Sequence, residues 1–156
     1  MTEIYVDADA CPVREEVYRV AERLGLQVHV VFNGSRPIMP PGRAKVRLVV
    51  VGDTADAADD WIAERITCAD ICVTADIPLA SRCLAKDARA IAPNGKIWTK
   101  DNIGQALAGR ELSRHLRELG VGGGGPPPFS KSDRSRFLSA LDTALQALLR
   151  QSAAKG

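Results

Sequence analysis

Short runs of β-branched and aromatic residues alternate along this chain with segments in which apolar residues recur every three or four positions. The runs predicted as strands cover residues 3–7, 27–32, 46–51, 69–74, 88–92 and 96–99. The segments predicted as helices before the C-terminal region cover residues 12–25, 55–67, 77–87 and 101–119. Strands that alternate with such helices form β–α–β units with right-handed crossovers. The pattern therefore predicts an α/β fold of three layers, in which helices flank a mostly parallel sheet.

The sequence also predicts where two of these strands lie in the sheet. The run VRLVVV at 46–51 is typical of a central parallel strand that is covered on both faces. The shorter run ARAIA at 88–92 is expected at an edge. Between the second and third strands, residues 33–45 hold three prolines and two glycines, which predicts a loop.

The C-terminal region differs in composition from the rest of the chain. Residues 120–131 contain four consecutive glycines and three consecutive prolines, which predicts a linker. A last helix is expected over 132–152, with a capping box formed by Ser130 and Asp133 at its start. Because some 20 residues cannot form a core alone, we expect this helix to pack back on the 1–119 core and all 156 residues to form a single domain.

Composition excludes several classes of protein. The chain is 46% hydrophobic, which argues against a disordered protein, and its apolar runs are too short to cross a bilayer. The N-terminus has no basic segment of the kind that opens a signal peptide, so we expect a soluble cytoplasmic protein with no membrane partner. The net charge of +2 is uneven: residues 1–95 hold 11 basic and 14 acidic side chains, whereas 96–156 hold 10 and 5. This division is compatible with an acidic pocket beside a basic surface that binds a polyanion.

Aspartates follow the ends of several predicted strands. Asp7 ends the first strand, Asp9 comes two residues later, Asp53 follows the third strand and Asp76 follows the fourth. Three more lie in the first turns of the helix after the third strand: Asp56, Asp59 and Asp60. Ligands of open parallel sheets bind outside the carboxyl ends of the strands. Clustered carboxylates without histidine or cysteine favour hard cations, so Mg²⁺ or Mn²⁺ is the expected cofactor.

Two known families share parts of this pattern. The segment IYVDADAC resembles the nucleophile motif of haloacid dehalogenase-like phosphatases, up to Cys11 at its last position. That resemblance is local, because the acidic segment VVVGDTADAADD comes second in this chain and last in those enzymes. Four segments in order, VDADACPV, GDTADAADDWI, ADICVTADIPLASRCL and GGPPPFSKSDRSRF, resemble the bacterial YaiI/YqxD family. That family is similar to PIN-domain proteins, which are metal-dependent ribonucleases.

The PIN-like resemblance implies roles for particular residues. Asp7 matches the acid at the end of the first strand, and Asp76 matches the acid after the later strand. The helical acid is one of Asp56, Asp59 and Asp60, and Thr74 would orient Asp76 or a water. Many PIN nucleases carry a further acid shortly after the Asp76 position; here Ile77, Pro78 and Leu79 follow, and Asp9 is expected to take its place.

Polar and basic residues elsewhere are candidates for binding the substrate. Asn33 and Ser35 follow the second strand and are expected to reach the same edge of the sheet. Lys131, Arg134 and Arg136 lie at the start of the last helix, where they are expected to contact phosphates. Trp61 and Trp98 are expected in the core or at an interface and not as base-stacking platforms.

The leading interpretation is a metal-dependent phosphodiesterase that acts on RNA, or on another nucleic acid. Its expected catalytic residues are Asp7, Asp9 and Asp76, and its expected metal ligands are these three with Asp59 and Asp60. Two alternatives stay open: a phosphatase with Asp7 as nucleophile and Asp9 as acid and base, and a non-catalytic RNA-associated binding protein. The sequence also leaves the oligomeric state open, a homodimer included.

Overall fold

The structure, a computed structural model, describes residues 1–34, 38, 42, 45–54, 56–118 and 129–155. The strands are β1 (Glu3–Asp7), β2 (Gln27–Phe32), β3 (Lys45–Val50), β4 (Ile71–Val73), β5 (Arg89–Ile91) and β6 (Ile97–Trp98). The helices are α1 (Arg14–Leu24), α2 (Ala57–Arg65), α3 (Ile77–Ala85), α4 (Lys100–Glu118) and α5 (Lys131–Lys155), with a 3₁₀ turn η1 at Ala8–Ala10. The predicted α/β class and the mostly parallel sheet are confirmed.

The six strands form one sheet in the order β3-β2-β1-β4-β5-β6. The first five are parallel, and β6 pairs antiparallel with β5. The chain builds outward from β1 to β2 and β3, then crosses back to place β4 on the other side of β1. This reversal makes the carboxyl ends of β1 and β4 the switch point of the sheet, where open α/β folds leave a crevice for ligands.

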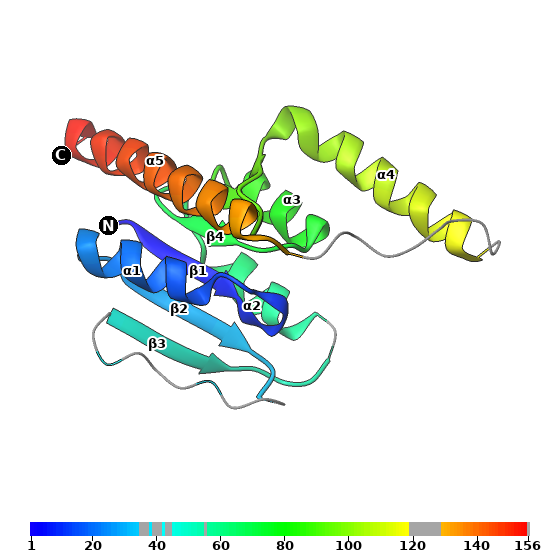
Figure 1. The fold of residues 1–156 in the computed structure, drawn as a ribbon, viewed down its shortest axis with the longest axis horizontal. Helices are drawn as coiled ribbons and strands as arrows, with labels where there is room; N and C mark the ends of the chain where they lie inside the picture. The colour runs from blue at the N-terminus through cyan, green and yellow to red at the C-terminus, as the bar shows by residue number, and fades with distance from the viewer. Residues whose placement is uncertain (35–37, 39–41, 43–44, 55, 119–128, 156) are drawn as a thin grey trace.

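Helices cover both faces of the sheet (Figure 1). On one face, α1 and α5 lie side by side and bury a core that includes Ile4, Val6 and Val28 from the strands. On the other face, α2 and α3 pack over Tyr5 and Cys72. Strand residues alternate between the two faces, so even and odd positions of β1 enter different cores. The remaining helix, α4, contacts α3 and then extends away from the sheet.

Two expectations about strand position are wrong. The segment predicted as a central strand at 46–51 forms β3, which lies at the edge of the sheet with Val50 66% exposed. The segment predicted as an edge strand at 88–92 forms β5, which lies between β4 and β6. The physical reason is that β6, only two residues long, turns back at Gly95 and covers the outer side of β5.

The last helix begins with the predicted capping box. The Ser130 amide and hydroxyl both donate to Asp133 Oδ2, at 3.0 Å each, and the Asp133 amide donates back to Ser130 Oγ at 3.1 Å. From there α5 packs against α1 and contributes Phe137, Leu141 and Leu145 to the core, all fully buried. Most of the linker predicted at 120–131, namely residues 120–128, lies outside the described residues.

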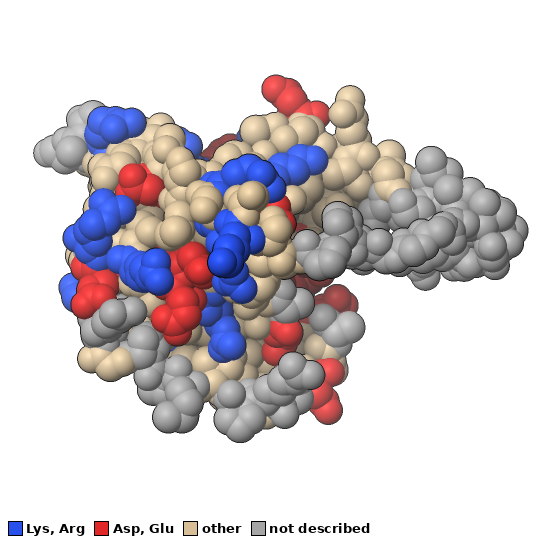
Figure 2. Space-filling view, in the orientation of Figure 1, with Lys and Arg blue, Asp and Glu red and all other residues tan. Residues whose placement is uncertain are grey.

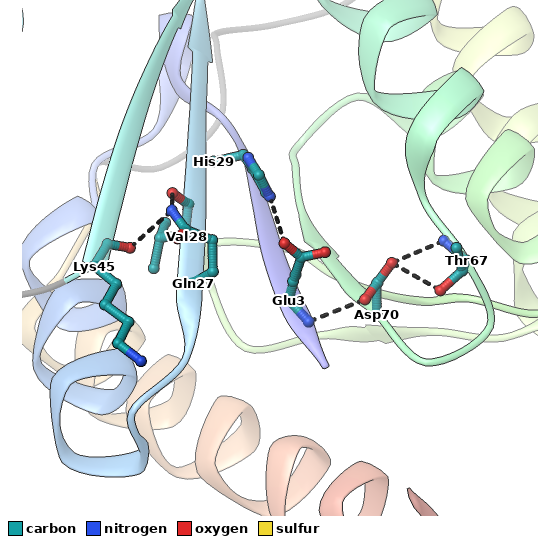
Figure 3. Close-up of polar contacts among 7 residues, drawn as sticks. All are labelled: Glu3, Gln27, Val28, His29, Lys45, Thr67 and Asp70. Carbon is teal, nitrogen blue, oxygen red and sulfur yellow. Dashed lines mark hydrogen bonds and ion pairs between the residues drawn. The ribbon is translucent and has the colours of Figure 1, made fainter. Parts of the chain in front are cut away.

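A polar network closes the amino end of the sheet (Figure 3). Asp70, only 1% exposed, accepts hydrogen bonds from the Glu3 amide and from the amide and hydroxyl of Thr67, each 2.9 Å long. Glu3 in turn contacts His29 Nε2 at 3.0 Å, and the His29 ring stacks on Tyr5. This network ties the start of β1 to β2 and to the turn before β4.

No helix within the described part of the chain is both long enough and apolar enough to span a membrane.

Candidate functional site

The switch point brings together residues from β1 and from the segment after β4. Asp7 is the last residue of β1, and Thr74 directly follows β4. The buried Thr74 hydroxyl donates to Asp7 Oδ2 at 2.9 Å and accepts a hydrogen bond from the Asp76 amide, also at 2.9 Å. One hydroxyl therefore positions both aspartates that the sequence singled out at the strand ends.

Asp76 has a second role as the N-cap of α3. Its Oδ1 accepts the Leu79 amide at 3.0 Å, which satisfies one of the free N–H groups in the first turn of the helix. Pro78 lies in the same turn, where its missing N–H costs nothing. The helix cap fixes the carboxylate and leaves its second oxygen, Oδ2, with no hydrogen bond from any described residue.

Of the three acids at the start of α2, Asp59 is influenced by the charges of Asp7 and Asp76 and forms the aspartate cluster with them. Burial raises the pKa of Asp59 to about 7, and the carboxylates of Asp76, Asp7 and Asp56 add to this rise. Asp56 is exposed just before α2 and acts through its charge. Asp60 makes an exposed ion pair with Arg82 at 2.8 Å, on the side of α2 that faces α3.

Asp9 lies on the η1 turn, next to the end of β2. Its Oδ1 accepts a hydrogen bond from the Asn33 amide at 3.2 Å, so these two candidates are brought together. Asp9 is exposed, and its charge contributes to the raised pKa of Asp7. Ser35, the other polar candidate after β2, lies outside the described residues.

Burial and neighbouring carboxylates raise the pKa values of Asp7 and Asp59 in the aspartate cluster. Burial raises the pKa of Asp7, and the Thr74 hydrogen bond opposes this rise, whereas the charges of Asp76 and Asp9 add to it. A cation at this place would lower both raised pKa values. The donors are all oxygens, which fits Mg²⁺ or Mn²⁺. Among the residues that the structure describes, however, no three His, Cys, Asp or Glu side chains already converge as a metal site.

The basic residues at the start of α5 are mostly engaged within the chain. Arg134 donates to the Pro12 carbonyl at 2.7 Å and contacts Glu16 at 3.2 Å, and Arg136 pairs with Asp133. Lys131 is exposed. Lys and Arg side chains gather over the middle of one face of the molecule and are interspersed with Asp and Glu (Figure 2). Of the three predicted phosphate contacts, Lys131 is therefore the one with no ion pair to another described residue.

Sequence reasoning missed two parts of this region. The thiol of Cys72, in β4, is buried against Cys83 and near Asp7 and Asp59, and its pKa is raised by the Cys83 contact and by burial. A cavity lined by the neighbours of Asp76, described below, has walls from four separate segments. No local pattern in the sequence marks either feature, because both depend on which segments become neighbours in the fold.

Comparisons with known proteins agree with the resemblance drawn from the four sequence segments. A family model described as the uncharacterised YaiI/YqxD family matches residues 5–147. A UPF0178 protein of Rhodospirillum rubrum is 57% identical over 148 residues, which cover 95% of this chain and 98% of that protein. UPF0178 proteins of Parvibaculum lavamentivorans and Rhodopseudomonas palustris are 55% and 56% identical, over 97% and 99% of this chain and 98% and 96% of their own lengths.

No solved structure matches this chain. The family model covers more than nine-tenths of the sequence, and the relatives match it nearly from end to end. The chain belongs to the YaiI/YqxD family.

Proposed function

We propose that this protein is a metal-dependent phosphodiesterase that cleaves RNA at the carboxyl edge of its sheet. The observation that carries the proposal is that the Thr74 hydroxyl bonds both Asp7 and the Asp76 amide at the switch point, while the charges of these two aspartates add to the raised pKa of Asp59. Mutually repelling carboxylates in a partly buried place are unfavourable for folding, which is the usual mark of a functional site. The resemblance to PIN-domain ribonucleases agrees with this reading.

The residues that would hold a divalent cation are Asp7, Asp59 and Asp76, with Asp9 at the outer side. When bound, such an ion activates water and offsets the negative charge that develops on a phosphate under attack. Oδ2 of Asp76 and Oδ1 of Asp7 are the oxygens proposed for this purpose, because among the described residues Leu79 and Thr74 donate hydrogen bonds to the other oxygen of each carboxylate.

Thr74 and the first turn of α3 act by positioning. The Thr74 hydroxyl sets the orientation of Asp7, and the α3 cap sets that of Asp76. Both carboxylates are therefore held in place before a ligand arrives, so little ordering remains to be done on binding.

Asp59 can hold or release a proton at its carboxylate near neutral pH, because its pKa is about 7. This value applies to the protein without a cation. Binding of a cation favours the ionised carboxylate, so it is coupled to release of that proton. The exposed ammonium of Lys131 is the group proposed to meet the rest of the polyanion.

The test is cleavage of end-labelled single-stranded RNA by purified protein in Mn²⁺, with EDTA and the variant Asp76→Asn in parallel. Asparagine caps a helix as well as aspartate does, so this variant should keep the fold, which circular dichroism checks. We expect it to lower the cleavage rate by at least about 100-fold. The matched control is Asp87→Asn, which removes an exposed aspartate that pairs with Lys100.

Cleavage by wild type and Asp87→Asn in Mn²⁺ alone would support the proposal. Equal cleavage by Asp76→Asn would remove this residue from the mechanism. Absence of cleavage by folded wild-type protein would overturn the nuclease proposal. Trapping an aspartyl-phosphate with a phosphate analogue would then favour the phosphatase alternative, and metal-independent RNA binding would favour the non-catalytic one.

A further inference from the structure

A cavity of about 540 Å³ lies at the same edge of the sheet. Its lining includes Ala75 and Ile77, the two chain neighbours of Asp76, and Pro12, which follows the turn that carries Asp9. Ligand cavities in proteins fall at about 300–1,000 Å³, so this one is large enough for a small molecule or for one unit of a polymer. The cavity is therefore lined by the residues on either side of Asp76, whereas the side chains of Asp7, Asp59 and Asp76 are not part of its lining.

The walls of the cavity are apolar and partly aromatic. The rings of Trp98 and Phe129 both line it. Each ring has a cation near its face: Lys96 Nζ lies 4.8 Å from the Trp98 ring centre, and the Arg134 guanidinium lies 5.0 Å from that of Phe129. An apolar cavity with cations at its aromatic walls suits a flat, polarisable group attached to something anionic.

Polar groups are also present, and two of them have no partner among the described residues. The Trp98 indole Nε1 is buried and makes no hydrogen bond. Asn94 uses its carbonyl oxygen to accept the Lys96 amide at 3.0 Å, which leaves its NH₂ group with no hydrogen bond to a described residue. An asparagine amide can recognise the polar edge of a nucleobase.

The walls are held together by close packing between the β5–β6 turn and α5. Gly95 has a φ of +93°, and a Cβ on it would lie 2.8 Å from the carbonyl carbon of Arg136. Only glycine allows this approach. The turn that carries Asn94 and Lys96 is therefore fixed against the helix whose start carries Phe129, and the cavity exists before a ligand arrives.

We propose that this cavity holds one nucleobase of the RNA strand whose phosphate lies at the Asp76 carboxylate. The inference rests on the proposed function, because it takes the neighbouring ligand to be a phosphodiester. A phosphodiester at Asp76 has a nucleoside on each side, and the space lined by Ala75 and Ile77 is the apolar volume next to it. The base packs between the aromatic walls, Asn94 meets its polar edge, and Lys96 lies toward the anionic backbone.

With this cavity, tight binding would require a nucleobase as well as a sugar-phosphate backbone. Binding to phosphates alone is sequence-independent and falls steeply with salt, whereas base stacking is much less sensitive to salt. We therefore expect adenosine and uridine 5′-monophosphates to bind more tightly than ribose 5-phosphate at the same charge. Binding should persist in EDTA, because the cavity needs no cation.

The test measures these three compounds by isothermal titration calorimetry in EDTA, with wild type and four variants. Phe129→Ala removes one aromatic wall and Asn94→Asp replaces an amide donor with a negative charge. We expect each to weaken binding of the nucleotide monophosphates by at least about tenfold, and we expect Phe129→Ala to leave binding of ribose 5-phosphate unchanged. Phe129→Tyr keeps the aromatic wall and should bind as wild type does. Lys45→Ala, an exposed lysine on β3, is the matched surface control.

The outcomes separate this inference from the nuclease proposal. Nucleotide binding that is lost in Phe129→Ala and Asn94→Asp and kept in Phe129→Tyr supports the cavity, whether or not RNA is cleaved. Equal binding of ribose 5-phosphate and the nucleotides would overturn it, even if Mn²⁺-dependent cleavage is found. Nucleotide binding that the variants leave unchanged would overturn it too, because the site would then lie elsewhere.

Discussion

Two aspartates at opposite ends of the strands have opposite surroundings: Asp70 is buried at the amino end of the sheet, and Asp7 is half-buried at the carboxyl end. At the amino edge, Asp70 accepts three hydrogen bonds from two amides and a hydroxyl (Figure 3). At the carboxyl edge, Asp7 accepts one hydroxyl and otherwise meets the charges of Asp76 and Asp9. Both residues are aspartates beside strands of the same sheet, so the contrast comes from the groups that surround them.

The two sets of surroundings imply different contributions of Asp70 and Asp7 to stability and binding. A buried charge that is fully hydrogen-bonded by N–H and O–H donors stabilises the fold, because removing it strands those donors. A partly buried charge among other carboxylates lowers stability unless a ligand compensates it. Changes at the amino edge should therefore alter the free energy of unfolding, whereas changes at the carboxyl edge should alter binding and catalysis.

The largest effect on stability is expected for Asp70→Ala. The Glu3 and Thr67 amides would lose their partner in a place that water hardly reaches, which should cost about 3 kcal/mol. That corresponds to a fall of roughly 10 °C in melting temperature, measured by calorimetry. Asp7→Asn is the paired variant and should destabilise the metal-free protein much less. The comparison fails if both variants destabilise the protein equally.

A smaller loss of stability is expected for Thr74→Val, which removes the hydroxyl and keeps the size of the side chain. The Asp76 amide loses its acceptor and Asp7 loses the hydrogen bond that opposes its raised pKa. Unfolding by urea should show a loss of about 1–2 kcal/mol. The pKa of Asp7, followed by carboxyl NMR, should rise further. A fall in that pKa would contradict the role given to the hydroxyl.

Stability of the metal-free protein should depend on pH through Asp59. Its pKa in the folded state, about 7, lies above its ordinary value of 3.8, so the folded state holds this proton more tightly than the unfolded chain does. This contribution to stability is fully present below the ordinary pKa and is lost as pH rises toward and through 7. The melting temperature of the metal-free protein should therefore fall from pH 4 to pH 8. Added Mn²⁺ should raise the melting temperature more at pH 8 than at pH 5.

Asp59→Asn should flatten that pH dependence and raise the melting temperature of the metal-free protein at pH 8. The variant removes the charge but keeps the shape. If the slope is unchanged in the variant, the titrating group is elsewhere.

The smallest effect is expected for Asp60→Asn, one residue further along α2. Its ion pair with Arg82 is exposed, with both side chains about half accessible, so its loss should change stability by less than about 0.5 kcal/mol. Loss of Mn²⁺ binding in this variant, measured by calorimetry, and not in Asp59→Asn would reverse the assignment of the helical acid.

Much of the fold could be predicted because the strand segments are locally distinctive. The segments 3–7 and 27–32 match β1 and β2 residue for residue, since β-branched runs with clear ends signal strands without reference to the rest of the chain. The order of strands in the sheet could not be predicted in the same way. The apolar run at 46–51 looks central, yet it forms an edge strand beside β2, because the later strand β4 pairs with β1 and not with β3.

The same distinction applies to the candidate site. Asp7 and Asp76 could be found because strand ends place them at one edge by topology alone. The choice of Asp59 over Asp60 also had a signal in the sequence: Asp59 precedes Ile62 by three residues and Ile66 by seven, which puts it on the buried stripe of α2. The cavity had no such signal, because Pro12, Trp98 and Phe129 meet only through tertiary packing.

One long-range contact has a consequence for the order of synthesis. Arg134 at the start of α5 donates to the carbonyl of Pro12, 122 residues earlier, and Phe137 completes the core over β1. A ribosome therefore releases the strand that ends in Asp7 long before the helix that covers it. The nascent chain exposes part of that strand's apolar face until α5 has been made, and the cavity lacks the wall formed by Phe129 until the same stage.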